Sequence, residues 1–138
     1  MTIESKTVVA QTTPEKLYDF LCDFNNLSRM LSVGPVQGIS STADRCSFSV
    51  NGFMQITLTY LERTPYSRVV IGPASDTMSN MPFRCSIILG ANGVDSTQLK
   101  IQFDMEGGNP MMTMMIKPKL REAADKMAEQ LAYFGNAL

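Results

Sequence analysis

The chain has 138 residues, 44% of them hydrophobic and 18% charged, and its 12 basic and 13 acidic side chains leave a net charge of −1. This length and composition predict one globular domain over residues 1–138, and the balanced charge argues against electrostatic capture of nucleic acid or of an anionic membrane. The sequence contains no histidine, the commonest general base and metal ligand, so the usual hydrolytic triads and metal sites are excluded.

The first predicted element is a strand over residues 3–10. Its apolar side chains alternate, with Ile3 and Val9 on one face and Val8 and Ala10 on the other. No apolar run in the chain approaches the roughly 18 residues of a membrane span, and the first residues lack the apolar core of a signal peptide. We therefore expect a cytoplasmic protein without integral membrane association.

Two short helices are predicted next. Residues 12–15 (TTPE) supply a threonine cap, a proline in the first turn and an early acidic side chain, all of which favour a helix start. The apolar side chains that follow have helical spacing: Leu17, Phe20, Leu21 and Phe24. Asn25-Asn26 is predicted to end this helix. Residues 27–31 indicate a second one, which stops at Gly34-Pro35.

Residues 36–106 are predicted to form antiparallel strands joined by turns. Asn51-Gly52 is the strongest signal for a two-residue hairpin. Apolar and polar side chains alternate most clearly in residues 54–60, 83–89 and 99–105. The strands therefore share one apolar face and one polar face, and another element has to cover the apolar face.

The C-terminal segment is predicted to be that covering element. Asn109 can cap a long helix and Pro110 can occupy its first position, whereas Pro118 is predicted to kink the helix or to separate its first turns. The apolar residues of this segment again have helical spacing: Ile116, Leu120, Ala123, Ala124, Met127, Leu131 and Phe134. Together the elements predict an α+β fold.

This order of elements resembles the SRPBCC superfamily, which includes the START lipid-transfer domains, the birch-pollen allergen family and polyketide cyclase-like proteins. The resemblance covers essentially the whole chain and is carried by residues 13–21 (TPEKLYDFL) and residues 120–127 (LREAADKM). It implies a helix-grip fold, with two short helices after the first strand and a curved antiparallel sheet of about six or seven strands around a long C-terminal helix. The short Asn51-Gly52 turn departs from the glycine-rich loop of the pollen allergens.

The resemblance further implies that an apolar ligand lies between the concave sheet and the long helix. The predicted ligand-binding residues are those of the inner strand face and the methionines at the start of the last helix. They are Phe48, Met54, Ile56, Leu58, Tyr60, Phe83, Cys85, Ile87, Ile101, Phe103, Met111, Met112 and Met115.

Two groups within this set have more specific expected roles. Tyr60 shares the parity of the apolar strand residues, so its hydroxyl is expected either to anchor a polar ligand end or to bind water at the rim. Met111, Met112 and Met115 are the predicted portal, because thioether side chains adapt to ligands of differing shape, and Gly107-Gly108 is the predicted hinge. The alternative is that these methionines simply pack beneath a kinked helix.

The leading functional hypothesis is binding or transport of a hydrophobic small molecule, such as a lipid, an isoprenoid or an aromatic polyketide, with no cofactor or metal. No catalytic residue is predicted, since an inward Cys85 lacks an activating base. One alternative is a cyclase-like or dehydratase-like enzyme in which Tyr60 or a carboxylate moves protons. Another is a protein-interaction module of the chaperone-activator kind.

Two further predictions concern the oligomeric state and the cellular compartment. A homodimer through an outer strand edge or through residues 74–80 stays open. Cys22, Cys46 and Cys85 are odd in number and widely spaced, which favours buried thiols over disulfides or a zinc site. This usage fits a reducing cytoplasm.

Overall fold

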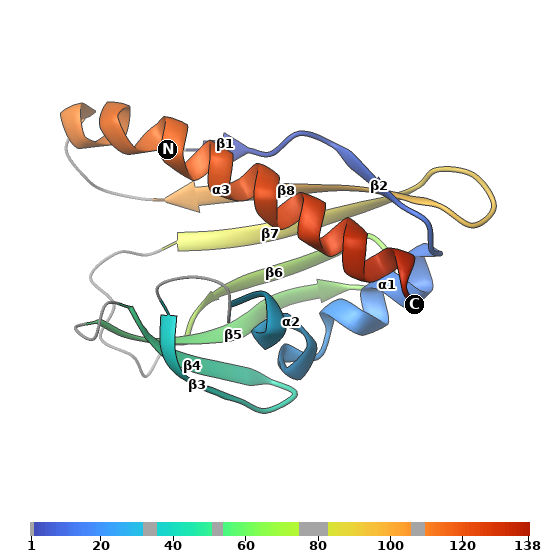
Figure 1. The fold of residues 1–138 in the computed structure, drawn as a ribbon, viewed down its shortest axis with the longest axis horizontal. Coiled ribbons are helices and arrows are strands. Elements are labelled where there is room, and N and C mark those ends of the chain that lie inside the picture. The colour runs from blue at the N-terminus through green and yellow to red at the C-terminus, as the bar shows by residue number, and fades with distance from the viewer. Residues whose placement is uncertain (1, 32–35, 51–53, 75–82, 106–109) are drawn as a thin grey trace.

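The computed structural model describes residues 2–31, 36–50, 54–74, 83–105 and 110–138 (Figure 1). Within those ranges the description leaves out the side chains of Met30, Leu31, Val36, Val50, Met54, Pro110, Met112, Thr113 and Ile116. The described residues form eight strands and three helices. In chain order these are β1 Thr2–Glu4, β2 Val8–Ala10, α1 Pro14–Leu21, α2 Phe24–Leu31, β3 Val36–Ser41, β4 Arg45–Val50, β5 Met54–Thr64, β6 Arg68–Pro73, β7 Phe83–Ala91, β8 Thr97–Met105 and α3 Pro110–Asn136.

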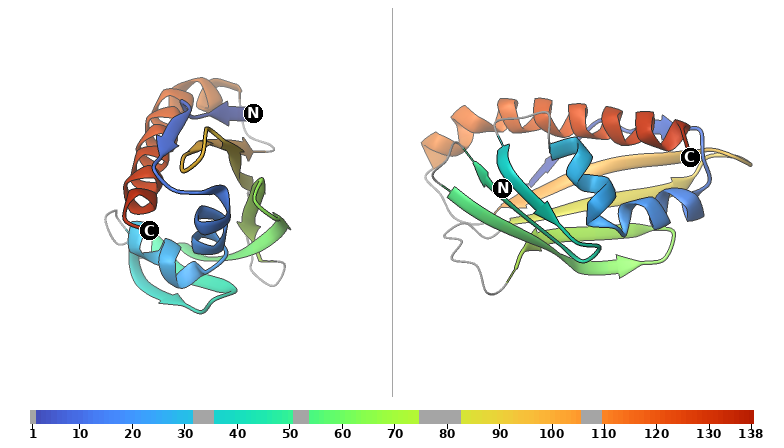
Figure 2. Two further views of the ribbon diagram at one scale, coloured as in Figure 1. Left: turned by 90° about the vertical axis from the view of Figure 1, so that its right-hand side faces the viewer. Right: turned by 60° about the horizontal axis from the view of Figure 1, so that its bottom comes forward.

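The strands form one antiparallel sheet in the order β1-β8-β7-β6-β5-β4-β3, and β2 also pairs with β8. The sheet curls around α3, and α1 and α2 lie on the same concave side (Figure 2). The predicted α+β helix-grip architecture is therefore confirmed, including the two short helices and the long final helix. Among the described residues, no helix combines the length and the apolar character that crossing a bilayer requires.

An eighth strand arises because the first predicted strand is divided at Ser5. The backbone N–H of Ser5 donates to the carbonyl of Ile101 (2.8 Å), and the Ser5 hydroxyl accepts from the N–H of Ile101 (2.9 Å). This irregularity shifts the pairing with β8 by one residue, since Ile3 pairs with Phe103 but Val8 pairs with Leu99. Consequently Ile3 is buried whereas Val9 is 40% exposed. The prediction that these two side chains share a face is wrong.

The break between α1 and α2 lies earlier than predicted. Thr13 caps α1, because its hydroxyl accepts from the N–H of Lys16 (3.3 Å), and Cys22 ends the helix. The carboxylate of Asp23 then accepts from the N–H of Asn25 (2.9 Å). Asp23 thus caps α2, which begins at Phe24, so Asn25 and its neighbour lie inside the second helix instead of ending the first.

The long helix α3 is continuous across Pro118, so its first turns are not a separate segment. Its buried side chains are small or apolar and include Ala124, Ala128 and Leu131, whereas Ala123, expected on the buried stripe, is exposed. At the C-terminal end a Cβ atom on Gly135 would lie 3.0 Å from the Cβ of Ala10. This glycine allows the helix to approach β2 closely.

Polar contacts fix α3 along the N-terminal segment. The backbone N–H of Lys6 donates to the carboxylate of Asp125 (2.7 Å), and the Lys6 ammonium pairs with Glu129. At the end of the helix the Asn136 side chain accepts from the N–H of Gln11 (2.7 Å). The N-terminal segment therefore holds the helix over the open side of the sheet.

Candidate functional site

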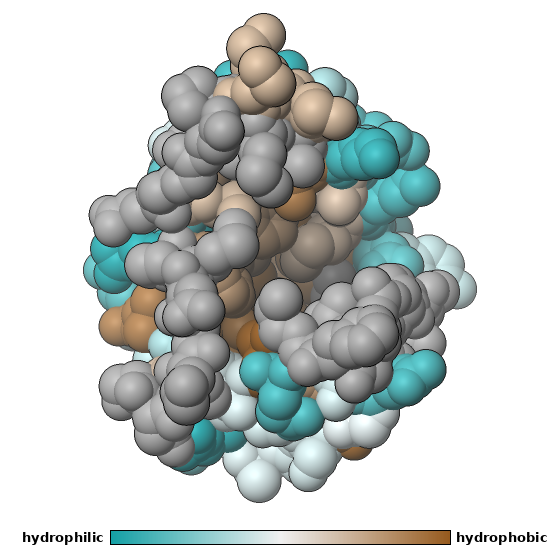
Figure 3. Space-filling model, turned by 90° about the vertical axis from the view of Figure 1, so that its left-hand side faces the viewer, coloured by the Kyte–Doolittle hydropathy of each residue, from teal (hydrophilic) through white to brown (hydrophobic). Residues whose placement is uncertain are grey.

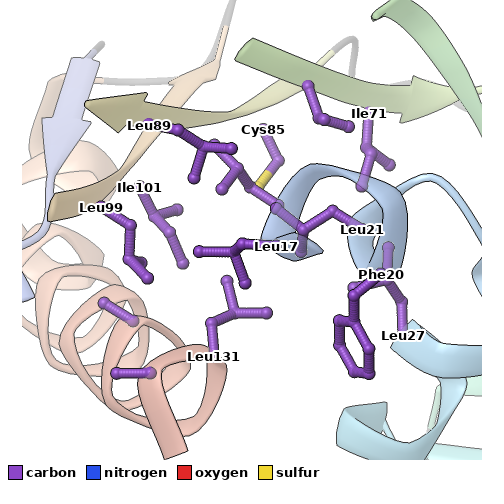
Figure 4. Close-up of a cluster of buried hydrophobic side chains, with 14 of the residues drawn as sticks. Leu17, Phe20, Leu21, Leu27, Ile71, Cys85, Leu89, Leu99, Ile101 and Leu131 are labelled. Atoms are coloured by element: carbon purple, nitrogen blue, oxygen red, sulfur yellow. The ribbon is translucent and has the colours of Figure 1, made fainter. Parts of the chain in front are cut away.

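One half of the space between sheet and helices is filled. Leu17 and Leu21 of α1 extend toward Leu89 and Ile101 of the sheet and toward Leu131 of α3 (Figure 4). These side chains come from the C-terminal half of β7, the middle of β8 and the last third of α3. The amphipathic spacing of α1 thus supplies the side chains that close this end of the interior.

The other half contains a cavity of about 230 Å³. Figure 3 shows recessed apolar side chains at the end of the molecule where α3 begins. Among the described residues, every one that lines the cavity is apolar or carries a thiol. They are Phe24, Leu27, Phe48, Ile56, Leu58, Ile71, Phe83, Cys85, Ile87, Phe103, Met127 and Leu131.

The strand pairing explains why the sheet residues converge. Ile71 of β6 pairs with Cys85 of β7, and Cys85 pairs with Phe103 of β8, which forms a row across three strands. Phe48 of β4 likewise pairs with Ile56 of β5. Because directly opposed residues of an antiparallel pair point to the same face, these side chains all enter the concave interior.

Seven of the thirteen residues predicted to bind ligand line the cavity. They are Phe48, Ile56, Leu58, Phe83, Cys85, Ile87 and Phe103. The sequence argument missed Phe24, Leu27, Ile71, Met127 and Leu131 as lining residues. Four of these missed residues come from helices, and their apolar helical spacing was the available signal.

The other predicted residues lie elsewhere or outside the description. Ile101 is completely buried in the filled half of the interior. Met111 and Met115 are exposed on α3 and are not among the lining residues. The side chains of Met54 and Met112 lie outside the described part of the chain, as do the predicted Gly107-Gly108 hinge and the Asn51-Gly52 turn.

Tyr60 contacts the protein in a way that neither sequence-based expectation anticipated. Its hydroxyl donates a hydrogen bond to the backbone carbonyl of Leu21, at the end of α1. The Tyr60 ring lies against the Phe24 ring, with the two centroids 4.4 Å apart. The guanidinium of Arg63, which is also on β5, lies 4.9 Å from the centroid of the Tyr60 ring. Burial raises the pKa of the Tyr60 hydroxyl, so this group stays a protonated donor.

Cys85 is the one ionisable group among the described lining residues. Burial raises the pKa of its thiol to about 12, so the thiol is neutral and weakly nucleophilic near neutral pH. Within the described ranges, no three cysteine, aspartate or glutamate side chains converge as metal ligands would. The arrangement is suited to holding an apolar molecule by dispersion and by exclusion of water.

The other two cysteines, Cys22 and Cys46, are not among the described lining residues of the cavity. All three are free thiols, and Cys46 is buried, whereas Cys22 is only half-buried. Burial raises the pKa of Cys22 as well, although a hydrogen bond with Tyr18 opposes that effect. The expectation of a fully buried thiol therefore does not hold at Cys22.

No sequence-family model and no curated protein matches the chain. Among solved structures, a START superfamily protein from Mycobacterium smegmatis is 14% identical, with a TM-score of 0.63 over 96% of this chain and 98% of that one. Norcoclaurine synthase from Thalictrum flavum is 10% identical, with a TM-score of 0.67 over 97% and 85% of the two chains. A further structure of that enzyme contains dopamine and hydroxybenzaldehyde.

A third similar structure is the Aha1 dimer from Colwellia psychrerythraea, which is 18% identical, with a TM-score of 0.60 over 91% of this chain and 96% of that one. Each of these matches spans most of both chains. At such low identities the likeness shows the fold, and function has to be argued from the site.

Proposed function

Because the chain has the helix-grip fold of the SRPBCC superfamily, we propose that residues 1–138 form a single domain that binds a compact, uncharged, hydrophobic small molecule. The site is the cavity between the sheet, α2 and α3. The observation that carries the proposal is a lining that is apolar throughout its described part, with the neutral thiol of Cys85 as its only ionisable group. A cytoplasmic location stays a prediction.

The volume limits the ligand. An apolar cavity of about 150 Å³ is large enough to bind benzene, whereas pockets for drug-sized ligands have volumes of roughly 300–1,000 Å³. A cavity of about 230 Å³ lies between these sizes, so it suits a molecule such as a substituted aromatic ring or a short isoprenoid. A long acyl chain would extend beyond the described lining.

The lining also limits the charge of the ligand. An ion buried without a partner costs several kcal/mol even after relaxation. Phe24, Phe48, Phe83 and Phe103 offer ring faces and edges but no counter-charge. Neutral, unsaturated molecules should therefore bind better than carboxylates or amines of the same size.

The proposal is tested first by native mass spectrometry of freshly purified protein, with solvent extraction of any bound molecule. Naphthalene and the neutral fluorophore N-phenyl-1-naphthylamine then serve as defined probes. We expect both to bind and to raise the melting temperature. Cys85→Leu, which fills the cavity from the central strand, should weaken binding, whereas Cys46→Ala, a core cysteine outside the lining, should bind as wild type.

The other predicted functions give different outcomes. A cyclase-like enzyme would turn over an aromatic substrate and would require an acid or base beyond the described lining. A protein-interaction module would bind neither probe and would be unaffected by Cys85→Leu. Failure of both probes and of the extraction would overturn the binding proposal.

A further inference from the structure

The amino-terminal turns of α3 carry an exposed apolar surface that the ligand site does not use. Met111, Met114 and Met115 are 72%, 79% and 71% exposed, and we call these three residues the methionine tip. In Figure 1 this part of α3 extends past the end of β8. In Figure 3 pale-brown side chains gather over the same turns, above the recessed apolar interior.

The tip forms one stripe on the helix. Positions 111, 114 and 115 have the three-and-four spacing that places side chains on a common face. At about 100° per residue, the buried side chains of Ala124 and Leu131 lie far around the helix from this stripe. The stripe therefore points away from the protein's own core, and its three side chains are not the rim of the core cluster.

Basic residues accompany the stripe. Lys117, Lys119 and Arg121 are all exposed, and residues 110–121 contain no acidic side chain. At about 100° per residue, Lys119 and Arg121 fall on opposite flanks of the methionine stripe. Among the described residues none of these three cations makes an ion pair; the acidic residues of α3 begin at Glu122.

We propose that the methionine tip, with the two cations on its flanks and Lys117 next to it in the same basic segment, docks onto the surface of an anionic lipid bilayer. Apolar side chains on one helix face with cations on its flanks are the pattern of an interfacial helix, which buries the apolar face at the boundary of headgroups and acyl chains. The long aliphatic parts of the cationic side chains can lie along that boundary while their charges meet lipid phosphates and carboxylates.

The charge pattern decides between this occupant and a second copy of the chain. A symmetric dimer through the tip would place Lys117, Lys119 and Arg121 near the same residues of the partner, and like charges in an interface oppose association. An anionic surface turns the same charges into attraction. The net charge of −1 argued against membrane capture, but that value averages this basic segment with the acidic remainder of the chain.

The inference goes beyond the proposed function and does not depend on it. Vesicle binding requires only the exterior of α3, whereas probe binding requires the cavity. The two proposals can therefore fail separately. If both hold, the apolar site lies at the end of the molecule that meets the bilayer, which would suit exchange of a ligand with the membrane.

Flotation of the intact chain with phosphatidylcholine vesicles, with and without phosphatidylserine, tests the docking. We expect binding to the phosphatidylserine vesicles, little binding without this lipid, and a loss of binding at high salt. The triple variant Lys117→Gln, Lys119→Gln, Arg121→Gln should lose on the order of 100-fold in affinity, at roughly fivefold per cation. The triple variant Met111→Ser, Met114→Ser, Met115→Ser should lose tenfold or more.

Matched controls lie on the same molecule. Val94→Ser removes a side chain that is 91% exposed in the β7–β8 turn, and Lys16→Gln removes an exposed cation from α1. Both should bind vesicles as wild type, and circular dichroism should show every variant folded. Absence of wild-type binding at low salt, or a methionine variant that binds normally, would overturn the proposal. A dimer in light scattering that the methionine variant abolishes, without vesicle binding, would assign the tip to self-association instead.

Discussion

The hydroxyl of Tyr60 donates a hydrogen bond to the backbone carbonyl of Leu21 and so joins β5 to the end of α1. The pairing of β5 with β6 shifts register between Tyr60 and Glu62. Such a bulge re-aims the strand and its side chains. Tyr60 therefore connects the strand to the helix that closes the filled half of the interior, and its hydroxyl donates to the backbone.

Tyr60→Phe should destabilise the fold by about 1–3 kcal/mol, because the half-buried carbonyl loses its donor while the ring keeps its contact with Phe24. Urea unfolding measures the change, and Tyr133→Phe, which removes an exposed hydroxyl from α3, is the control. Binding of N-phenyl-1-naphthylamine should be unchanged. Normal stability combined with weakened probe binding would instead support the prediction that the Tyr60 hydroxyl anchors a polar ligand end.

Gly72 pairs with Thr59 next to the bulge, where the sheet leaves no room for a side chain. A Cβ atom at this position would lie 2.5 Å from Cδ1 of Leu61 and 3.0 Å from the carbonyl oxygen of Phe83. Gly72→Ala should therefore lower the free energy of unfolding by about 1–3 kcal/mol, the usual cost of overpacking. Gly90→Ala, on β7, should have little effect because a Cβ there meets nothing within 4 Å.

A second substitution separates the two clashes at Gly72. Leu61→Ala removes the nearer atom and leaves the backbone contact with Phe83 in place. In the double variant part of the loss should therefore be recovered, and a double-mutant cycle of unfolding free energies measures the coupling. Strictly additive losses would show that the Leu61 side chain moves aside without cost.

The Cys85 thiol predicts how stability depends on alkaline pH. Its pKa is raised from 9.0 to about 12 by burial. Between these values the unfolded chain has lost this proton and the folded chain has kept it, so the unfolded state binds fewer protons and stability falls as pH rises. One thiol contributes a slope of at most about 1.4 kcal/mol per pH unit. Cys85→Ala should show a shallower decline above pH 9.0 than wild type, and an identical decline would contradict the assignment.

Much of the fold could be predicted because it depends on local periodicity. The alternation in residues 54–60 and 83–89 and the stripe around Leu131 each indicate an apolar face, and such faces have few ways to cover one another. The errors arose where a polar side chain bonds to the backbone and so ends an element or shifts its pairing. Ser5 does so by hydrogen bonding to the backbone of Ile101, and Asp23 does so by capping a helix. Neither event changes the hydrophobic pattern.

The candidate site was less predictable because parity shows only which face a side chain occupies. Ile101 and Phe103 lie on the same strand face, yet Ile101 is in the filled half of the interior and Phe103 lines the cavity. The difference depends on how far Leu17 of α1 and Leu131 of α3 reach along that face. How far these helix side chains reach is set by tertiary packing, which the alternation within one strand does not predict.

These two residues give the sharpest test of the boundary between core and cavity. Phe103→Ala and Ile101→Ala both remove apolar side chains from the same face of β8. Ile101 is fully buried, so its variant should cost about 2–5 kcal/mol, and the partly buried Phe103 should cost less than a fully buried phenylalanine would. Only the Phe103 variant enlarges an existing cavity. A ligand that fits the enlarged space stabilises the folded state by an amount that rises with the logarithm of its concentration relative to its Kd.

Saturating naphthalene should therefore raise the melting temperature of Phe103→Ala by more than it raises the melting temperature of wild type. For Ile101→Ala the increase should be no larger than for wild type. Differential scanning fluorimetry with the probe in excess measures both shifts. Each shift is measured against the same variant without the probe, so a general effect of the probe on weakened proteins would raise both melting temperatures. Equal rescue would mean that the interior near Ile101 is open as well, and the division between core and cavity would then be wrong.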